Sequence, residues 1–231
     1  MVSFLYSSVG HGGASGYLAL MVLFDFSPEK MKSTALLLNL FVAGVSFYHF
    51  YKEGYFNIRL FWLFAIASVP FAFLGGYLNI DFFYYKKLLG LLLIFAVYRI
   101  LVLNNSTLKK NRNLKIWQGL TIGSIIGFFS GLIGIGGGVI LTPIILIMNY
   151  GGIKEAAAVS ALFIFVNSLA GIVGQFSSGV VYESKLLYLV LLSLIGGFLG
   201  SYFGSKKINN SFLRFLLGVV LLVASLKLFI I

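Results

Sequence analysis

The run K-I-W-Q-G-L-T-I-G-S-I-I-G-F-F-S-G-L-I-G-I-G-G-G-V-I-L-T-P-I-I-L-I-M covers residues 115–148 and contains one charge, at Lys115. As a continuous helix it would be roughly 50 Å long at 1.5 Å per residue, whereas the hydrocarbon core of a bilayer is about 30 Å thick. Three consecutive glycines, at 136–138, unwind a helix locally because each lacks the side chain that restricts the backbone. The sequence therefore predicts an apolar element that is broken, re-entrant or strongly tilted in a membrane.

The rest of the chain has the same apolar character. Of its 231 residues 60% are hydrophobic and 10% are charged, and the mean hydropathy is +1.02. A soluble domain is about half apolar and a quarter charged, so much of this surface must face lipid. Cutting the chain at its charge clusters leaves roughly eight stretches of spanning length, near 1–24, 30–51, 59–78, 83–103, 115–148, 155–176, 185–205 and 211–231. They are continuously apolar, which favours helices over barrel strands of alternating character.

Charge and cysteine content narrow the class further. We attribute the formal charge of +11 to basic loops beside the membrane, and we expect no nucleic-acid partner. The absence of cysteine excludes disulfides and thiolate chemistry. No basic segment precedes the first apolar stretch, whose first charge is Asp25, so we expect no cleaved signal peptide.

Short motifs of the first half recur in the second half in the same order. Val9-Gly10-His11-Gly12-Gly13 matches Ile133-Gly134-Ile135-Gly136-Gly137 at a distance of 124 residues. Five further matches follow at distances of 125 to 128: Ser33 with Ser160, Ala43-Gly44 with Ala170-Gly171, Gly54 with Gly179, Leu74-Gly75-Gly76-Tyr77 with Leu199-Gly200-Ser201-Tyr202, and Leu88-Leu89-Gly90 with Leu216-Leu217-Gly218. The pattern predicts an all-α membrane protein of two homologous four-span repeats, with glycine-broken helices at its centre.

A polar segment joins the two halves. We assign residues 1–103 to the first repeat, 104–115 to a basic linker and 116–231 to the second repeat. The linker holds four cations, Lys109, Lys110, Arg112 and Lys115. Cytoplasmic loops are enriched in such residues, so we place the linker in the cytoplasm and the chain in the cell membrane.

The two glycine motifs are the candidate binding site. A helix that restarts after a break directs its N-terminal N–H groups and roughly half a positive charge into the gap, which suits an anion. We therefore expect the motifs to meet near the midplane and to bind substrate through Gly10, His11, Gly12, Gly13, Gly134, Ile135, Gly136, Gly137 and Gly138. The glycines outside the motifs, such as Gly75 and Gly200, are expected to serve helix packing.

Ionisable and polar side chains support the same hypothesis. All six acids fall at expected loops or span ends, which disfavours a cation carrier. His11 lies inside a motif, whereas His49 is expected at the membrane interface; the two give no metal site, and we expect no cofactor. Neutral contacts are expected from Ser8 and Ser130 beside the breaks, and from Asn39 and Asn167 at nearly equivalent repeat positions. Each amide can bind substrate or link helices, and both alternatives stay open.

These motifs resemble the TauE/SafE sulfite exporter family, also called the sulfonate-uptake permease superfamily. The resemblance covers nearly the whole chain and rests on three features: residues 134–138 with Pro143 following, the stretch Lys154-Glu155-Ala156-Ala157-Ala158-Val159-Ser160, and the paired glycines at 75–76 and 196–197 with Gly200. It implies a carrier of seven to eight spans for sulfite, sulfonates or related small anions, driven by ion gradients. The sequence departs from the family pattern at His11, where an apolar residue is usual.

We expect a secondary transporter of a small oxoanion or organic acid, embedded in the bilayer, with a coupling proton or ion and a homo-oligomeric state both left open. A membrane-embedded enzyme is the first alternative, and no catalytic set of residues supports it. A non-transporting assembly subunit predicts collapsed glycine motifs instead. A cation channel is disfavoured by the lack of interior acids.

Overall fold

The computed structural model of the protein describes residues 1–102, 115–180 and 186–206, together with Leu222 and Leu226. This part of the chain is helical and has no strand. Its helices are α1 (Val2–Ser7), α2 (Ala14–Leu23), α3 (Pro28–Lys52), α4 (Ile58–Tyr77), α5 (Phe82–Val102), α6 (Ile116–Ile133), α7 (Gly138–Ile147), α8 (Ile153–Ser177) and α9 (Leu186–Lys206). The expected all-α class is therefore confirmed.

Five of these helices are long and apolar enough to cross a membrane: α3, α4, α6, α8 and most of α9. The spans expected at 30–51, 59–78, 83–103, 155–176 and 185–205 each correspond to a single helix, which agrees with the sequence within two residues at either end. The span expected at 211–231 lies outside the described residues, apart from Leu222 and Leu226. The fold is thus a multi-pass helical membrane protein.

Two expected spans are broken. The 115–148 run divides into α6 and the ten-residue α7, and the first apolar stretch divides into α1 and the ten-residue α2. Both interruptions fall at the glycine motifs, as expected, although Gly138 already belongs to α7. At 1.5 Å per residue, α2 and α7 reach only about half way across the hydrocarbon core.

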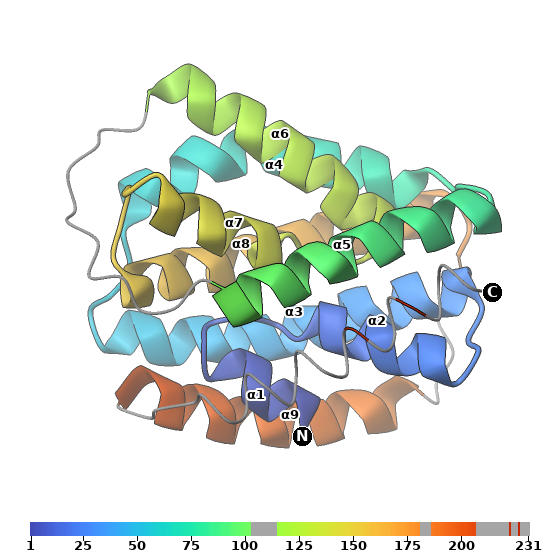
Figure 1. The fold of residues 1–231 in the computed structure, drawn as a ribbon, viewed down its shortest axis with the longest axis horizontal. Helices are drawn as coiled ribbons and strands as arrows, with labels where there is room; N and C mark the ends of the chain where they lie inside the picture. Colours follow the sequence, from blue (N-terminus) through green and yellow to red (C-terminus); the bar gives the residue numbers. More distant parts are fainter. Residues whose placement is uncertain (103–114, 181–185, 207–221, 223–225, 227–231) are drawn as a thin grey trace.

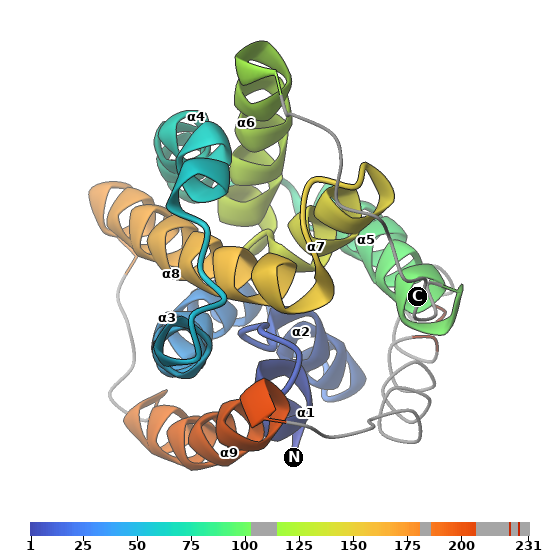
Figure 2. The same cartoon turned by 90° about the vertical axis from the view of Figure 1, so that its left-hand side faces the viewer.

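The long helices α3 and α8 lie side by side in the middle of the bundle. Figure 2, an end-on view, shows α4 and α6 on one side of this pair and α1 and α9 on the other. In Figure 1 the same helices run roughly along the long axis, with α2, α5 and α7 packed beside the glycine breaks. The breaks therefore lie in the interior of the molecule.

Glycines set how closely these helices pack, and the arrangement occurs twice. A Cβ on Gly75 of α4 would overlap the carbonyl oxygen of Phe128 in α6, and a Cβ on Gly200 of α9 would overlap that of Phe4 in α1. Gly200 lies 125 residues after Gly75, and Phe128 lies 124 residues after Phe4. Helix backbones in contact require residues without side chains, so the packing role expected of Gly75 and Gly200 is confirmed.

His49 joins two helices of the bundle. It is buried in the face of α3 that meets α9, and its Nδ1 lies 2.8 Å from the hydroxyl oxygen of Ser201. Its ring also packs edge-on against Phe198. His49 is therefore a contact between α3 and α9, in the last turn of α3.

Candidate functional site

The two half-helices begin at glycines with left-handed backbones. Gly13 precedes α2 with φ 103°, and Gly137 precedes α7 with φ 79°. Gly10, Gly134 and Gly136 also have positive φ values, between 75° and 88°. Residues with a Cβ rarely adopt this conformation, which explains why glycine recurs where each helix stops and restarts.

Both helix starts leave backbone donors without acceptors. Within the described residues, the N–H groups of residues 14–16 in α2 and of 138 and 139 in α7 donate to no carbonyl oxygen or side chain. Neither start has a side-chain cap. These N–H groups lie at the positive ends of the two helix dipoles, so each start favours negative charge.

Asn39 connects the two starts. This residue of α3 is completely buried, and its side chain contacts both motifs, with Oδ1 against Gly12 and Nδ2 against Gly136. A Cβ on either glycine would overlap the amide, so both motifs need glycine where Asn39 approaches. Neither amide atom has a hydrogen-bond partner within the described part of the chain. The structure thus brings Gly12, Gly136 and Asn39 together, as the site hypothesis requires.

Ser130 provides a further polar group at the second motif. Its Cβ lies 3.5 Å from the position a Cβ on Gly137 would occupy. The side chain is completely buried, and its hydroxyl has no partner among the described residues. Unpaired buried polar groups are uncommon in folded proteins, and Ser130 and Asn39 both place such groups beside the glycine motifs.

His11 extends from the first motif to the start of α7. Its Nδ1 lies 2.9 Å from the carbonyl oxygen of Val9, and its Nε2 lies 3.2 Å from that of Gly138. Nε2 is also 3.0 Å from the hydroxyl of Thr142, which donates to the hydroxyl of Ser160 at 2.8 Å. His11 is thereby a buried contact between the two glycine motifs.

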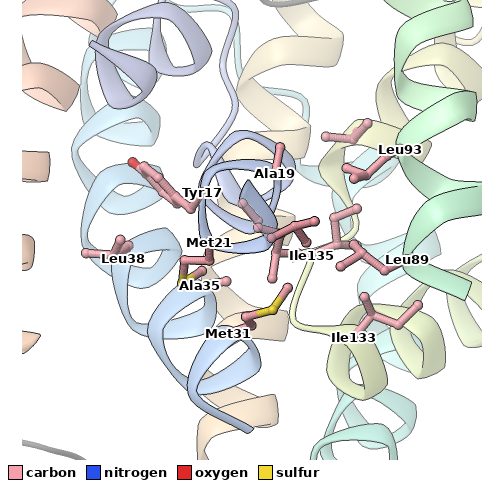
Figure 3. Close-up of a cluster of buried hydrophobic side chains, with 14 of the residues drawn as sticks. Tyr17, Ala19, Met21, Met31, Ala35, Leu38, Leu89, Leu93, Ile133 and Ile135 are labelled. Carbon is pink, nitrogen blue, oxygen red and sulfur yellow. The ribbon is translucent and has the colours of Figure 1, made fainter. Parts of the chain in front are cut away.

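The corresponding place at the other motif is apolar. Ile135, 124 residues after His11, packs in one hydrophobic cluster with Leu18 and Ala35. Figure 3 shows Ile135 among these buried side chains, between α2 and Leu89 of α5. Leu18 and Ala35 precede Thr142 and Ser160 by 124 and 125 residues. Three polar residues at one motif therefore replace three apolar ones at the other, and Ile135 contributes to the core.

Two other expected contacts, Ser8 and Asn167, lie elsewhere in the bundle. The hydroxyl of Ser8 donates to the carbonyl oxygen of Leu5 at 2.8 Å, and its backbone packs against Gly204 of α9. Asn167 faces α4, where its Oδ1 accepts from the hydroxyl of Ser68 at 2.9 Å. Gly13 faces the ring of its own helix residue Tyr17. We therefore do not include Ser8 or Asn167 in the site.

The contacts also correct the pairing of Asn39 with Asn167. Ile164 of α8 touches both Gly12 and Gly136, as Asn39 of α3 does, and it lies 125 residues after Asn39. The same spacing relates Lys32, beside Gly134, to Ala157, beside Gly10. The expected near-equivalence of Asn39 and Asn167 is wrong. Pairing Ser33 with Ser160 places α8 two residues away from the alignment that the contacts give.

Lys32 is a buried cation beside the second motif that sequence reasoning missed. It belongs to α3, and its Nζ donates to the carbonyl oxygens of Gly75, Gly76 and Leu78 at 3.2, 2.8 and 3.0 Å. It thereby caps the C-terminal end of α4, where the helix dipole is negative. Its own backbone packs against Gly134. The sequence feature that could have identified Lys32 is a lysine one turn inside an apolar helix.

A bundle of apolar helices in which two broken helices meet at an interior polar site is the architecture of a membrane transporter. The chain belongs to the TauE/SafE sulfite exporter family, whose model matches residues 1–228. The chain is a multi-pass membrane transporter of this family and not an enzyme.

Relatives that match along most of their length are described in the same terms. A probable membrane transporter protein of Sinorhizobium fredii is 35% identical over 235 residues, which cover 99% of this chain and 94% of the relative. One from Methanocaldococcus jannaschii is 28% identical over 240 residues, covering 96% and 89%. A probable membrane transporter protein of Bacillus subtilis matches over a shorter stretch, 46% of this chain and 38% of the relative, at 32% identity. No solved structure matches.

Proposed function

We propose that the protein is a secondary transporter that moves a small anion, such as a sulfite, a sulfonate or a related oxoanion, across the cytoplasmic membrane. The observation that carries the proposal is the meeting of two half-helix N-termini at Asn39. Both helix starts have donors without acceptors, and two buried polar side chains without partners lie beside Gly12, Gly136 and Gly137. A small anion would satisfy these donors and would be stabilised by both helix dipoles.

A duplicated architecture accounts for the site. Residues 1–103 and 116–231 would be two homologous repeats, each supplying one glycine-broken helix. The contacts that recur at spacings of 124 and 125 residues support this division. The glycines of both motifs and their neighbours are buried, so the bundle must open for an anion to reach them. Movement of one repeat against the other would expose the site to each side in turn.

A pair of serine variants tests the site. Ser130→Ala removes an unpartnered buried hydroxyl beside Gly137, and Ser168→Ala removes another from α8. We expect Ser130→Ala to weaken binding of a strong-acid sulfonate to the purified protein about fivefold, the equivalent of one hydrogen bond. Ser168→Ala should leave the affinity within about twofold. Equal effects of the two substitutions would contradict the assignment of the site to the second motif.

A further inference from the structure

Asn39 carries chemical information that the backbone donors lack. A carboxamide presents an acceptor oxygen and a donor nitrogen at the same time. Both atoms are buried and have no partner within the described residues. Leaving a buried polar group unpaired costs about 1–3 kcal/mol, so a ligand that satisfies both amide atoms is favoured over one that satisfies a single atom. A flip of the Asn39 carboxamide, which exchanges its nitrogen and oxygen, would still leave one donor and one acceptor for the ligand to satisfy.

The remaining polar groups at the site add donors. The N–H groups at the starts of α2 and α7 can only donate, and the Ser130 hydroxyl can do so. An oxoanion without bound hydrogen has acceptors only, so it pairs with these donors and with the amide NH₂. It leaves the amide oxygen unpaired and turns a negative atom towards it. A ligand that completes the site must therefore supply a donor of its own.

The residue that corresponds to Asn39 sharpens this requirement. Ile164 touches the same two glycines from the opposite long helix and offers no polar atom. The two long helices therefore present different surfaces to the ligand, a carboxamide from α3 and an aliphatic side chain from α8. The requirement for a donor on the ligand therefore comes from α3 alone.

We infer that the site selects a monovalent anion that carries a hydrogen-bond donor beside its charged group. Members of this class are a singly protonated oxoanion and a sulfonate or carboxylate with a hydroxyl substituent. The inference rests on the proposed anion site and adds which anions it prefers. Asn39 is the residue that sets the preference.

Two sulfonates of similar shape test the inference. 2-Hydroxyethanesulfonate and propane-1-sulfonate differ by a hydroxyl in place of a methyl group, and both stay charged at neutral pH. Their affinities for the purified full chain in detergent would be measured by calorimetry. We expect the hydroxyl compound to bind at least about fivefold more tightly, the ratio that one net hydrogen bond provides.

Asn39→Leu, a substitution of nearly equal size, should reduce this preference to less than about twofold, and it should weaken the binding of both sulfonates because the amide NH₂ donor is lost as well. The control is Asn79→Leu, the same change at an exposed amide, which should retain the preference. Equal binding of both sulfonates by the unmodified protein would overturn the inference and leave the anion site intact, and this comparison needs no variant. A preference that persists in Asn39→Leu would overturn the role of Asn39. A folded protein that binds neither sulfonate would contradict the proposed function itself.

Discussion

Lys32 shows how a single buried charge is stabilised in an apolar bundle. Three carbonyl oxygens at the end of α4 surround its ammonium group. A hydrogen bond to a charged group has a net contribution of about 1.5–3 kcal/mol, and the burial of the charge opposes it. Lys32→Met retains the side-chain length and removes the donor. We expect the free energy of unfolding, measured thermally in detergent, to fall by roughly 2 kcal/mol.

Lys87→Met is the matched control for this substitution. Lys87 is exposed, and its Nζ lies 4.0 Å from the ring centre of Phe83. An exposed cation–π contact of this kind contributes about 0.5–1 kcal/mol or less. If Lys32→Met were no more destabilising than Lys87→Met, the cap at the end of α4 would not hold the helix.

His11 predicts a dependence of anion binding on pH. Carbonyl oxygens lie within hydrogen-bond distance of both ring nitrogens, and only the protonated ring donates from both. A bound anion would offset the resulting positive charge, so proton and anion would promote each other's binding. Affinity for a strong-acid sulfonate should therefore rise as pH falls and the ring of His11 takes up a proton, by up to about tenfold per pH unit.

The chain has two histidines, so substituting each in turn shows which one causes the pH dependence of anion binding. His11→Gln should flatten the affinity profile between about pH 5 and 8, the range of histidine titration. His49→Gln should leave it unchanged, because His49 contacts α9 and not the motifs. A slope in His11→Gln equal to that of the unmodified protein would exclude His11 as the coupled proton site.

At the scale of helices, the close pairing of α4 with α6 gives a further prediction. Gly75→Ser places atoms where the carbonyl oxygen of Phe128 lies, and forced overpacking destabilises by about 1–3 kcal/mol. Gly152→Ser makes the same change at the start of α8, where nothing lies within 4 Å and serine is a good helix cap. Thermal unfolding should distinguish the two, and a loss of stability in Gly152→Ser as large as in Gly75→Ser would contradict the packing role.

Helix positions were largely predictable from sequence, whereas helix register was not. Apolar length and charge clusters locate α3, α4 and α8 closely, and consecutive glycines locate both breaks. The residue of α8 that corresponds to Asn39 depends on which side of α8 faces the glycine motifs. A shift of two residues along α8 would put Val166 in the place of Ile164. The polar contact of His11 with Thr142 and Ser160 likewise joins residues more than 130 positions apart, which no local pattern reveals.

At the scale of the whole molecule, the proposed orientation in the membrane is open to direct labelling. The linker at 104–115 lies outside the described residues except for Lys115, and from its four cations we propose that it faces the cytoplasm. The chain contains no cysteine, so Lys110→Cys creates one labelling site. A membrane-impermeant maleimide should label it in inverted vesicles and not in intact cells. Labelling in intact cells would reverse the orientation.

Counterflow in proteoliposomes tests the central claim, that the protein is an anion carrier, most directly. Vesicles containing the purified protein are loaded with an unlabelled sulfonate and diluted into a trace of the same compound carrying a radiolabel. A carrier that exposes one site to each side in turn exchanges inner for outer anion, so the account predicts transient accumulation of label above its outside concentration, absent from protein-free vesicles. Label that reaches the outside concentration and does not exceed it would indicate a channel. Failure of the label to enter, for every sulfonate and oxoanion tried in this way, would contradict anion transport.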